Sequence, residues 1–309
     1  MNKIIVLLAA LLLSGVSMAQ NNILNAKDPS EFGKKTESQM ENDNDKPLPY
    51  GHVGDRDILW QRTTWETIDL DERVNFPLYY PVDTNFVGKE RRSLFHVLSA
   101  AARSGDLTLY GDSYFNEARE FEDVEPTLKS QKITNAGIDI LNENGIFVEE
   151  GVKPLDIDTT YNLPGFDEYI ETNTIGADDV KEYRIRGLWY FDTRQSELRY
   201  RLIGICPVTP DVNFPDDPTG VELFWVYYPD ARELLHNAHA FNTLNSARPI
   251  SFDHMLNSRR FNAVIYKMDN VQGDREVKRY IADNSMMQLL ESERLKEIIR
   301  NFEIDQWNY

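Results

Sequence analysis

The sequence predicts an α+β fold in which an antiparallel sheet is built around a central β-hairpin at about residues 183–206. Two runs of alternating apolar residues flank a polar stretch at 192–197. The first run holds Tyr183, Ile185, Trp189 and Phe191, and the second holds Leu198, Tyr200, Leu202 and Cys206. Side chains on a strand point to opposite faces in turn, so each run forms one apolar face. Because a lone hairpin is barely stable in water, it needs further strands, and residues 221–228 (VELFWVYY) are the expected third strand.

Several short helices are expected to pack against this sheet. Residues 93–103 have apolar side chains at helical spacing and precede Gly105, a residue type that favours helix ends. Further helices are predicted at 136–142, at 229–241, from Ser251 onward, at 274–281 and at 285–302. In the last of these, Ser285 and Gln288 match a capping box. The same helix carries an apolar stripe formed by Leu295, Ile298, Ile299 and Phe302.

Two stretches are predicted to lie outside regular central elements. Pro77 and Pro81 flank Leu78, Tyr79 and Tyr80. Since proline cannot donate a backbone hydrogen bond, this stretch is expected to be an edge strand or an extended arm. Residues 150–179 are rich in proline, glycine and acids and read as a loop between a smaller N-terminal half and the hairpin half.

The chain begins with an expected export signal at residues 1–19. Lys3 gives a positive start, residues 4–13 form an apolar core too short to cross a bilayer, and cleavage is expected between Ala19 and Gln20. No cysteine follows this core, so no lipid anchor is expected. Residues 20–57 are expected to be a disordered tail, which is either a plain spacer or a strap that orders on a partner. Residues 58–309 then form the α+β domain, with 150–179 as its candidate subdivision.

The charge balance is strongly acidic. The chain has 51 acidic and 33 basic residues, a formal net charge of -18. A field of that sign repels nucleic acid and anionic lipid headgroups, so neither is an expected partner. The single cysteine, Cys206, falls within a predicted strand, where its expected role is packing rather than chemistry.

Residues that suggest catalysis or metal binding are few. His236 and His239 are three apart on a predicted helix, which would place them on one face and makes them weak candidates for metal ligands. The spacing is not H-E-x-x-H, and no further ligand is fixed by the sequence. Acid pairs at 122–123, 178–179 and 216–217 could do acid–base work, but in a chain this acidic such pairs are expected by chance in loops. No nucleotide-binding, nucleophile-elbow or calcium-loop motif occurs. We therefore expect no cofactor and no enzymatic activity; the alternative is a secreted metal-binding module or hydrolase that uses both histidines and loop carboxylates.

The basic residues of the hairpin form the candidate protein interface. Arg184 and Arg186 alternate along the first strand, and Arg199 and Arg201 alternate along the second. Tyr190, with Leu188, Ile203 and Ile205, continues these faces. Arginine and aromatic residues are enriched at protein interfaces, which favours a binding surface. The other interpretation is a sheet face half covered by a helix, with arginine stems lying over it.

Several segments, in order, resemble the GldN/PorN family. They are ILWQRTTWETIDLDERVNFPLYYP, SLFHVLSAAARSGDLTLYGDSYF, YFDTRQSELRYRLIGICPV, LFWVYYPDARELL and SFDHMLNSRRFNAVIYKMDNV, which together run from about Ile58 to Val271. None of them is a catalytic motif, so the resemblance carries over no active-site residue.

The resemblance implies a periplasmic, non-enzymatic component of the type IX secretion system of the Bacteroidetes. In that family the protein forms a ring under the outer membrane with a lipoprotein partner, GldK/PorK. It also contacts the motor protein GldM/PorM, and in gliding members the machine supports motility. Contact with the membrane would then be indirect, through the lipoprotein.

Overall fold

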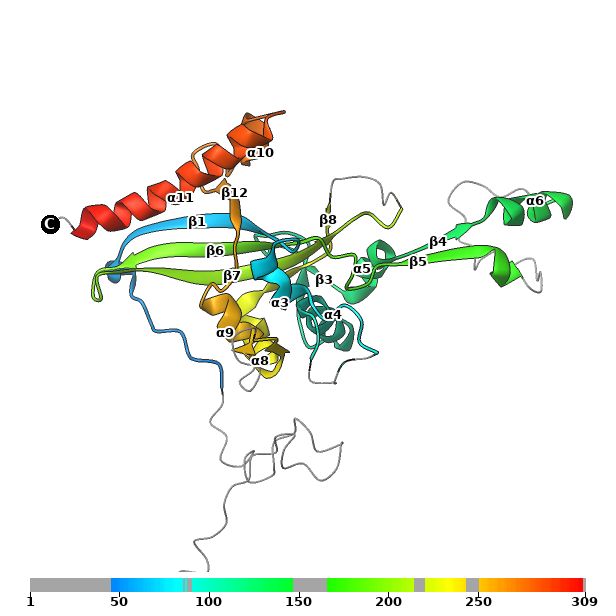
Figure 1. Ribbon diagram of the computed structural model, residues 1–309, viewed down its shortest axis with the longest axis horizontal. Helices are drawn as coiled ribbons and strands as arrows, with labels where there is room; N and C mark the ends of the chain where they lie inside the picture. Colours follow the sequence, from blue (N-terminus) through cyan, green and yellow to red (C-terminus); the bar gives the residue numbers. More distant parts are fainter. Residues whose placement is uncertain are drawn as a thin grey trace, which may run out of the picture. The chain divides into compact units, whose positions relative to one another are not determined.

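A long antiparallel hairpin lies at the centre of the sheet, as the alternation predicts. The computed structural model describes residues 46–85, 87, 91–146, 166–213, 220–242 and 250–307. The chain divides into Met1–Lys46 and Pro47–Tyr309, and the second unit is the one described below. Its main sheet has the strand order β12-β1-β6-β7-β9-β2-β3, with β8 beside β7 (Figure 1). The α+β class with an open antiparallel sheet is therefore confirmed.

The hairpin consists of β6 (Glu182–Asp192) and β7 (Glu197–Thr209). They pair along their whole length, but the register shifts between Arg186 and Gly187, where β7 contains one extra residue. Leu202 and Ile205 are three apart and still lie in the same core cluster, because this bulge moves the alternation by one position. We had expected Cys206 to share the face of Leu202, and this expectation is wrong. Cys206 packs with Trp65 and Trp225 instead.

Strand β1 (Ile58–Asp69) is the other long strand of the sheet and was not identified as a strand from the sequence. It pairs with β6 on one side and with β12 (Val264–Met268) on the other. Its threonine, tryptophan and isoleucine residues are strand formers. Thr64, Glu66 and Ile68 alternate along it and are all buried. The acid Glu66 breaks the apolar pattern that would have marked this strand.

The expected third strand at 221–228 is present in two pieces. β8 (Val221–Glu222) and β9 (Trp225–Tyr227) both pair with β7, and residues 223–224 interrupt them. Both interrupting residues, Leu223 and Phe224, are fully buried in the main core. The sheet continues from β9 through β2 (Leu109–Tyr110) to β3 (Ala118–Arg119).

Three helices supply much of the main core together with the sheet (Figure 1). They are α4 (Leu94–Ser104), α8 (Tyr228–Asn237) and α9 (Phe252–Asn257). α4 is confirmed with both of its ends: the Ser93 hydroxyl accepts from the His96 backbone N–H, and Gly105 adopts φ 78° after its last turn. Ser251 caps α9 as expected. α8 ends earlier than predicted, and its last turn is followed by β10 (His239–Ala240), which pairs with β11 (Ile250–Ser251).

The proline-flanked stretch is helical, so the prediction of an edge strand or extended arm is wrong. Phe76–Tyr79 forms the short helix α3, which follows a 3-10 turn, η3, at Arg73–Asn75. Pro77 lies in the first turn of α3, where the missing N–H costs nothing because it would have no partner in the helix. The buried Leu78 anchors this helix in the core.

A two-stranded ribbon extends away from the main sheet (Figure 1). After α5 (Phe121–Leu128), β4 (Lys129–Ile133) pairs with β5 (Ile170–Thr174). The ribbon carries α6 (Asn135–Glu143), close to its predicted position, and the 3-10 helix η4 (Phe166–Tyr169). Residues 166–174 are therefore not a loop, because Leu141 and Phe166 form a small separate core there. Ile146 is not in a strand, and residues 147–165 lie outside the described residues.

The C-terminal part places two helices beside the edge strand β12. α10 (Val277–Tyr280) is followed by α11 (Ser285–Trp307), which is longer than predicted. The first-turn backbone N–H of Met287 donates to the side chain of Asn284, so the cap is one residue earlier than the expected Ser285. The predicted stripe packs inward: Leu295 and Ile299 are buried, and Phe302 stacks on Trp60 with ring centroids 4.7 Å apart. Among the helices in the described ranges, none has the length and apolar character needed to cross a membrane.

Candidate protein interface

The register of the hairpin places the four predicted arginines on one face. Arg184 lies opposite Cys206 and Arg186 opposite Gly204, whereas Arg201 lies opposite Leu188 and Arg199 opposite Tyr190. Residues directly opposite each other share a face, and β6 carries no extra residue. Ile205, which we had expected to continue this face, lies in the main core because of the bulge.

Arg184 is tied to acids at the base of the hairpin. Its Nη1 lies 2.5 Å from Glu222 Oε1 and its Nε lies 3.2 Å from Glu182 Oε1. Glu222 also accepts from the indole nitrogen of Trp225 at 2.7 Å. Burial lowers the pKa of the Arg184 guanidinium, but the hydrogen bond and charge of Glu222 more than offset this, so the pKa is raised. Arg184 thus fixes β8 against β6.

Arg186 lies in an aromatic cluster. Its Nη1 donates to the backbone oxygen of Ser113 at 2.7 Å, and its guanidinium lies 5.2 Å from the ring centroid of Trp65 and 5.0 Å from that of Tyr114. Lys267 lies over the same Trp65 ring at 4.1 Å. Burial lowers the pKa of Arg186. The two cations are held by aromatic faces rather than by a carboxylate, which is a favourable arrangement for partly buried cations.

Arg201 holds the segment that precedes β1, which we call the strap (residues 47–54). The guanidinium of Arg201 lies 4.6 Å from the ring centroid of Tyr50, and its Nη2 donates to the Gly51 oxygen at 3.1 Å. Arg232 of α8 lies 4.1 Å from the same ring and donates to the Leu48 oxygen at 2.7 Å. For residues 47–57 the expectation of a disordered tail is therefore corrected, because cation–π contacts replace the missing aliphatic burial. Residues 20–45 lie outside the described part of the chain.

Arg199 and Tyr190 complete the predicted set. Arg199 forms an exposed ion pair with Glu197 at 3.1 Å, with 40% of its side chain accessible. Tyr190 is buried, and Arg201 lies 5.6 Å from its ring centroid. Arg199 is half-buried and its ion pair is with Glu197 of its own strand, so of the five predicted residues it is the one least tied to the rest of the fold. Binding of a partner to this face stays a prediction, and Arg199 is the residue through which it can be tested with the least effect on folding.

The two histidines are not brought together on a helical face. His236 lies in the last turn of α8, and His239 lies beyond its end in β10. The expected common helix stops at Asn237 because the following residue, Ala238, adopts an extended backbone. Within the described residues, no group of three or more His, Cys, Asp or Glu side chains is placed to hold a metal ion. The acid pair at 216–217 lies outside the described residues.

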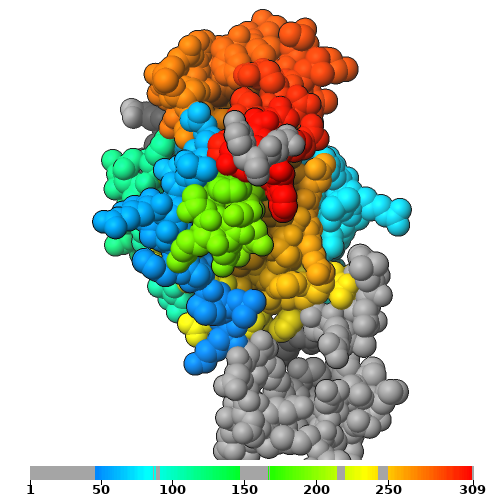
Figure 2. Space-filling view, turned by 90° about the vertical axis from the view of Figure 1, so that its left-hand side faces the viewer, coloured from blue at the N-terminus to red at the C-terminus, as the bar shows by residue number. Residues whose placement is uncertain are grey.

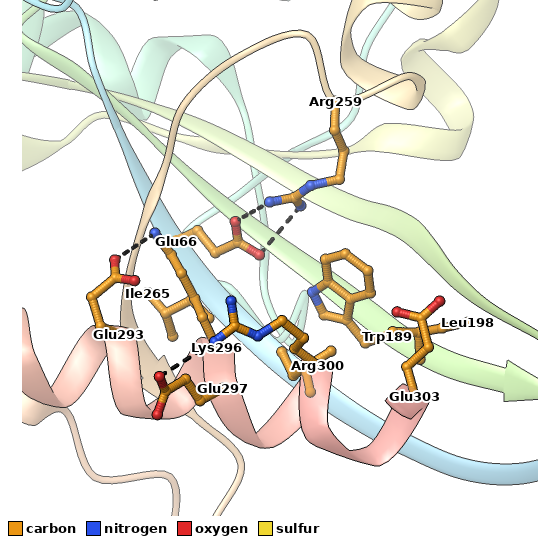
Figure 3. Close-up of a pocket in the computed structure, with 11 residues that line it drawn as sticks. Glu66, Trp189, Leu198, Arg259, Ile265, Glu293, Lys296, Glu297, Arg300 and Glu303 are labelled. Carbon is orange, nitrogen blue, oxygen red and sulfur yellow. Dashed lines mark hydrogen bonds and ion pairs between the residues drawn. The ribbon is translucent and has the colours of Figure 1, made fainter. Parts of the chain in front are cut away.

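A groove of about 340 Å³ runs between α11 and the sheet (Figure 3). Its floor holds an ion pair in which Arg259 Nη2 lies 2.6 Å from Glu66 Oε2. The Glu66 carboxylate is buried and also accepts from the Thr64 hydroxyl at 2.9 Å. Burial lowers the pKa of Arg259, but the charge of Glu66 more than offsets this, and the pKa is raised. The walls of the groove are apolar, formed by Trp189, Leu198, Ile265 and Ile299.

Arg259 combines this ion pair with an unusual backbone conformation. Arg259 follows Ser258, the C-cap of α9, and has φ 49°, a left-handed conformation in which glycine is usual. Its guanidinium also lies 4.1 Å from the ring centroid of Tyr200 and 5.1 Å from that of Trp189. The ion pair and the two aromatic rings thus hold the Arg259 side chain from three sides.

The rim of the groove is charged and comes from α11. It consists of Glu293, Lys296, Glu297, Arg300 and Glu303. Lys296 pairs with Glu293 and Arg300 with Glu297 (Figure 3). The residues that line this groove include no serine, cysteine or histidine, so they supply no nucleophile or proton shuttle of those types. The arrangement is suited to holding α11 and to contacts with another protein.

The sequence reasoning missed Tyr50, Glu66, Arg232 and Arg259. One signal was available for Glu66, because an acid at an inward position of a strand needs a buried cationic partner. Nothing in the sequence identifies which arginine that partner is. Tyr50 lies in a stretch whose polar composition hides its contacts.

Comparison with known families gives one match. The family described as gliding motility associated protein GldN matches residues 53–308 of this chain. The match extends from just before β1 to the end of α11 and so includes the hairpin and the groove. It confirms the resemblance seen in the sequence segments. No curated protein matches the chain.

Proposed function

The chain belongs to the GldN family of gliding motility associated proteins, and from this membership we propose that it is a non-enzymatic structural subunit of the type IX protein secretion machinery. In this proposal the chain is exported to the periplasm and lies against the inner face of the outer membrane. It associates with further copies of itself and with a GldK/PorK-like lipoprotein in a ring, and it contacts a GldM/PorM-like motor protein. In a gliding host the same machine supports motility.

The observation that carries the proposal is the extent of the family match. Residues 53–308 include every described strand and helix, from the 3-10 helix η2 (Asp55–Asp57) to α11. The family relation therefore applies to the whole folded unit rather than to one motif within it.

Two features of the structure support a structural role. The buried cations are used in internal contacts, since Arg232 pairs with Asp253 at 2.9 Å and Arg259 pairs with Glu66. The only cysteine is buried, and burial raises its pKa well above the ordinary value, which leaves a protonated and unreactive thiol.

Co-purification from the source organism tests this function. Protein carrying a C-terminal tag is extracted from outer membranes in mild detergent and analysed by size-exclusion chromatography and mass spectrometry. We expect a large complex that contains a lipoprotein with an acylated N-terminal cysteine. A matched control carries Leu11→Arg, which interrupts the expected export signal and should abolish the complex. Elution of the unaltered protein as a free monomer would contradict the proposal.

Elemental analysis of the same preparation tests the alternative function. A structural subunit of this kind needs no metal ion. Zinc at one ion per chain would favour the metal-binding alternative instead, if the zinc is absent from both the His236→Ala variant and the His239→Ala variant.

A further inference from the structure

An exposed cluster of aromatic rings lies on and directly after the short helix α3. Phe76 is 37% exposed and Tyr80 is 48% exposed, and Tyr79 is half-buried. The ring centroid of Tyr80 lies 5.5 Å from that of Phe76 and 4.7 Å from that of Tyr79, and both contacts are edge to face. We call these three residues the aromatic patch. Figure 2 shows the chain around α3, in cyan, at the surface. Clustered exposed apolar side chains mark interaction sites.

The chain that carries the patch is fixed by a buried asparagine. The side-chain nitrogen of Asn75 donates to the backbone oxygens of Asp69 and Asn262, at 2.6 Å and 3.1 Å. Its side-chain oxygen accepts from the backbone N–H of Asn262 at 2.9 Å. The buried Leu78 holds α3 in the main core. The rings are therefore presented by an ordered segment, which lowers the entropy cost of binding a partner.

Two exposed acids lie beside the patch. The hydroxyl of Tyr79 donates to the backbone oxygen of Asp178 at 3.0 Å. Burial raises the pKa of this hydroxyl, and the neighbouring Tyr80 and the charges of Asp178 and Asp71 raise it further. Within the described part of the chain, the carboxylates of Asp71 and Asp178 accept no hydrogen bond and form no ion pair. Their charge is therefore available to a cation from another molecule.

Among the described residues, no cation lies over the rings of the patch. The arginines and lysines that contact aromatic faces do so at other rings. Arg73 is the cation nearest to the patch in the sequence, and it forms no ion pair with Asp71 or Asp178. The patch thus combines aromatic faces and carboxylates that no described cation uses.

Elsewhere in this fold a ring and a carboxylate together hold an arginine. Arg259 pairs with Glu66 and lies 4.1 Å from the ring centroid of Tyr200. Arg232 is held in the same way, by one carboxylate and one ring. The two kinds of group that lie together at the aromatic patch are therefore the two that bind guanidinium groups inside this protein.

We propose that the aromatic patch, together with Asp71 and Asp178, binds an arginine side chain on a basic surface of a partner protein. A guanidinium stacks on aromatic faces and its planar set of N–H donors matches carboxylates, whereas a lysine ammonium is a point charge. The proposal rests on the proposed function, since it names the chemistry by which an assembly subunit would bind a different protein.

Charge favours this occupant over two others. A second copy of the chain carries the same net charge of -18, so its approach is opposed by repulsion. An anionic membrane surface is repelled by the same field and by the two acids at the patch. A basic protein is instead attracted by both.

Photo-crosslinking in cells of the source organism tests the proposal. A benzophenone derivative of phenylalanine replaces Phe76, and the crosslinked peptide is sequenced by mass spectrometry after digestion with a protease that does not cleave at arginine. We expect a peptide from another protein in which the captured position lies beside an arginine. Capture of a second copy of this chain, of lipid, of a peptide without arginine, or of nothing would overturn the proposal.

Substitutions at the patch give a second measurement. Asp71→Asn with Asp178→Asn should lower the yield of that crosslink about fivefold or more, because two attractive charges are lost. Tyr80→Ala should lower the yield by a similar factor, whereas Tyr80→Phe, which keeps the ring, should not. Helix α6 provides the matched control, since Asp139→Asn with Glu143→Gln changes two exposed acids away from the patch and should leave the yield unchanged. Equal yields from the patch and control variants would contradict the proposal.

An exchange of charges tests direct contact. Changing the captured arginine of the partner to aspartate should remove most of the crosslink, and Asp178→Arg in this chain should then restore part of it. If Asp178→Arg restores nothing, the acid and the arginine do not meet and the proposal is wrong.

The two proposals fail in different ways. If the unaltered chain still purifies with the outer-membrane lipoprotein but position 76 captures no arginine-bearing peptide, the inference about the aromatic patch is wrong and the proposed function stands. If the chain is a free monomer, the proposed function fails first. Melting temperatures of all variants, measured in parallel, identify any change that acts through unfolding.

Discussion

The Glu66–Arg259 pair shows how one side chain joins three parts of the chain. Glu66 comes from β1, Arg259 from the turn after α9, and the aromatic rings over the guanidinium come from β6 and β7. The Glu66 side chain is 1% exposed and the Arg259 side chain 25%. A buried ion pair adds little net stability when complete, but removing one partner leaves the other charge without compensation.

Glu66→Gln is therefore expected to lower the free energy of unfolding by about 3 kcal/mol. Urea denaturation followed by tryptophan fluorescence measures the loss. The exposed pair between Arg199 and Glu197 is the matched control, and Glu197→Gln should change stability by less than about 0.5 kcal/mol. Equal effects of the two substitutions would show that burial of the Glu66 carboxylate is unimportant.

Asp192 gives the hairpin an acid-sensitive end. Its buried carboxylate accepts from the backbone N–H of Arg194 at 3.0 Å and from the Arg194 side chain at 3.3 Å. The hydrogen bond from the Arg194 side chain lowers the pKa of Asp192 below its ordinary value of 3.8. The folded state then binds fewer protons than the unfolded state, so this contribution is present above pH 3.8 and is lost as the pH falls through the lower folded pKa.

Comparison with Asp192→Asn tests this pH dependence. The variant should melt below the unaltered protein at pH 6, and the difference in Tm should shrink as the pH falls below about 4. Circular dichroism melts at intervals between pH 6 and pH 3 measure it. A Tm difference that stays constant or grows in acid would exclude the carboxylate as its source.

Among the elements, the strap shows that order can come from a few cationic contacts. Tyr50 lies between the guanidinium groups of Arg201 and Arg232, and the backbone at Leu48 and Gly51 accepts hydrogen bonds from the same two side chains. The loop end of the hairpin lies beside the first part of the described chain, shown in blue in Figure 2. The strap therefore belongs to the folded unit although its composition resembles that of the preceding tail.

Two truncations separate the strap from the tail. A chain beginning at Pro47 should keep the free energy of unfolding within about 0.5 kcal/mol, because no described contact is removed. A chain beginning at Asp55 should lose about 2 kcal/mol, since the cation–π contacts of Tyr50 and the hydrogen bonds to the strap are removed. Urea denaturation of both against the chain from Gln20 measures the difference. A large loss already at Pro47 would show that earlier residues also belong to the fold.

The sequence predicts those elements whose signal is local. The alternation in β6 and in β7 before its bulge, and the Ser93 and Gly105 ends of α4, are local signals, and the structure confirms them. The missed features depend on residues distant in the sequence. Arg259 pairs with Glu66, which lies 193 residues earlier in the chain. The bulge of β7 brings Ile205 to the core side. For Pro77 the local signal was ambiguous, since proline suits both a first helical turn and an edge strand.

For the whole molecule, the surplus of acids is a physical constraint on stability. A net charge of -18 disfavours the compact state through self-repulsion. Two ion pairs in which both side chains are largely buried, Arg232–Asp253 and Arg259–Glu66, are poorly accessible to salt. The exposed pairs on α11 are each worth little. Screening should therefore weaken the repulsion more than it weakens the attractive pairs.

Raising NaCl from about 10 mM to about 300 mM is accordingly expected to raise Tm, because the Debye length falls from roughly 30 Å to well below 10 Å. A chain of this size gains roughly 2–4 °C for each kcal/mol of relieved repulsion. Differential scanning calorimetry at pH 7 measures the shift, and KCl at the same ionic strength should give the same value if screening is the cause. A fall in Tm with salt would mean that attractive surface pairs, such as those along α11, outweigh the repulsion between the excess acids.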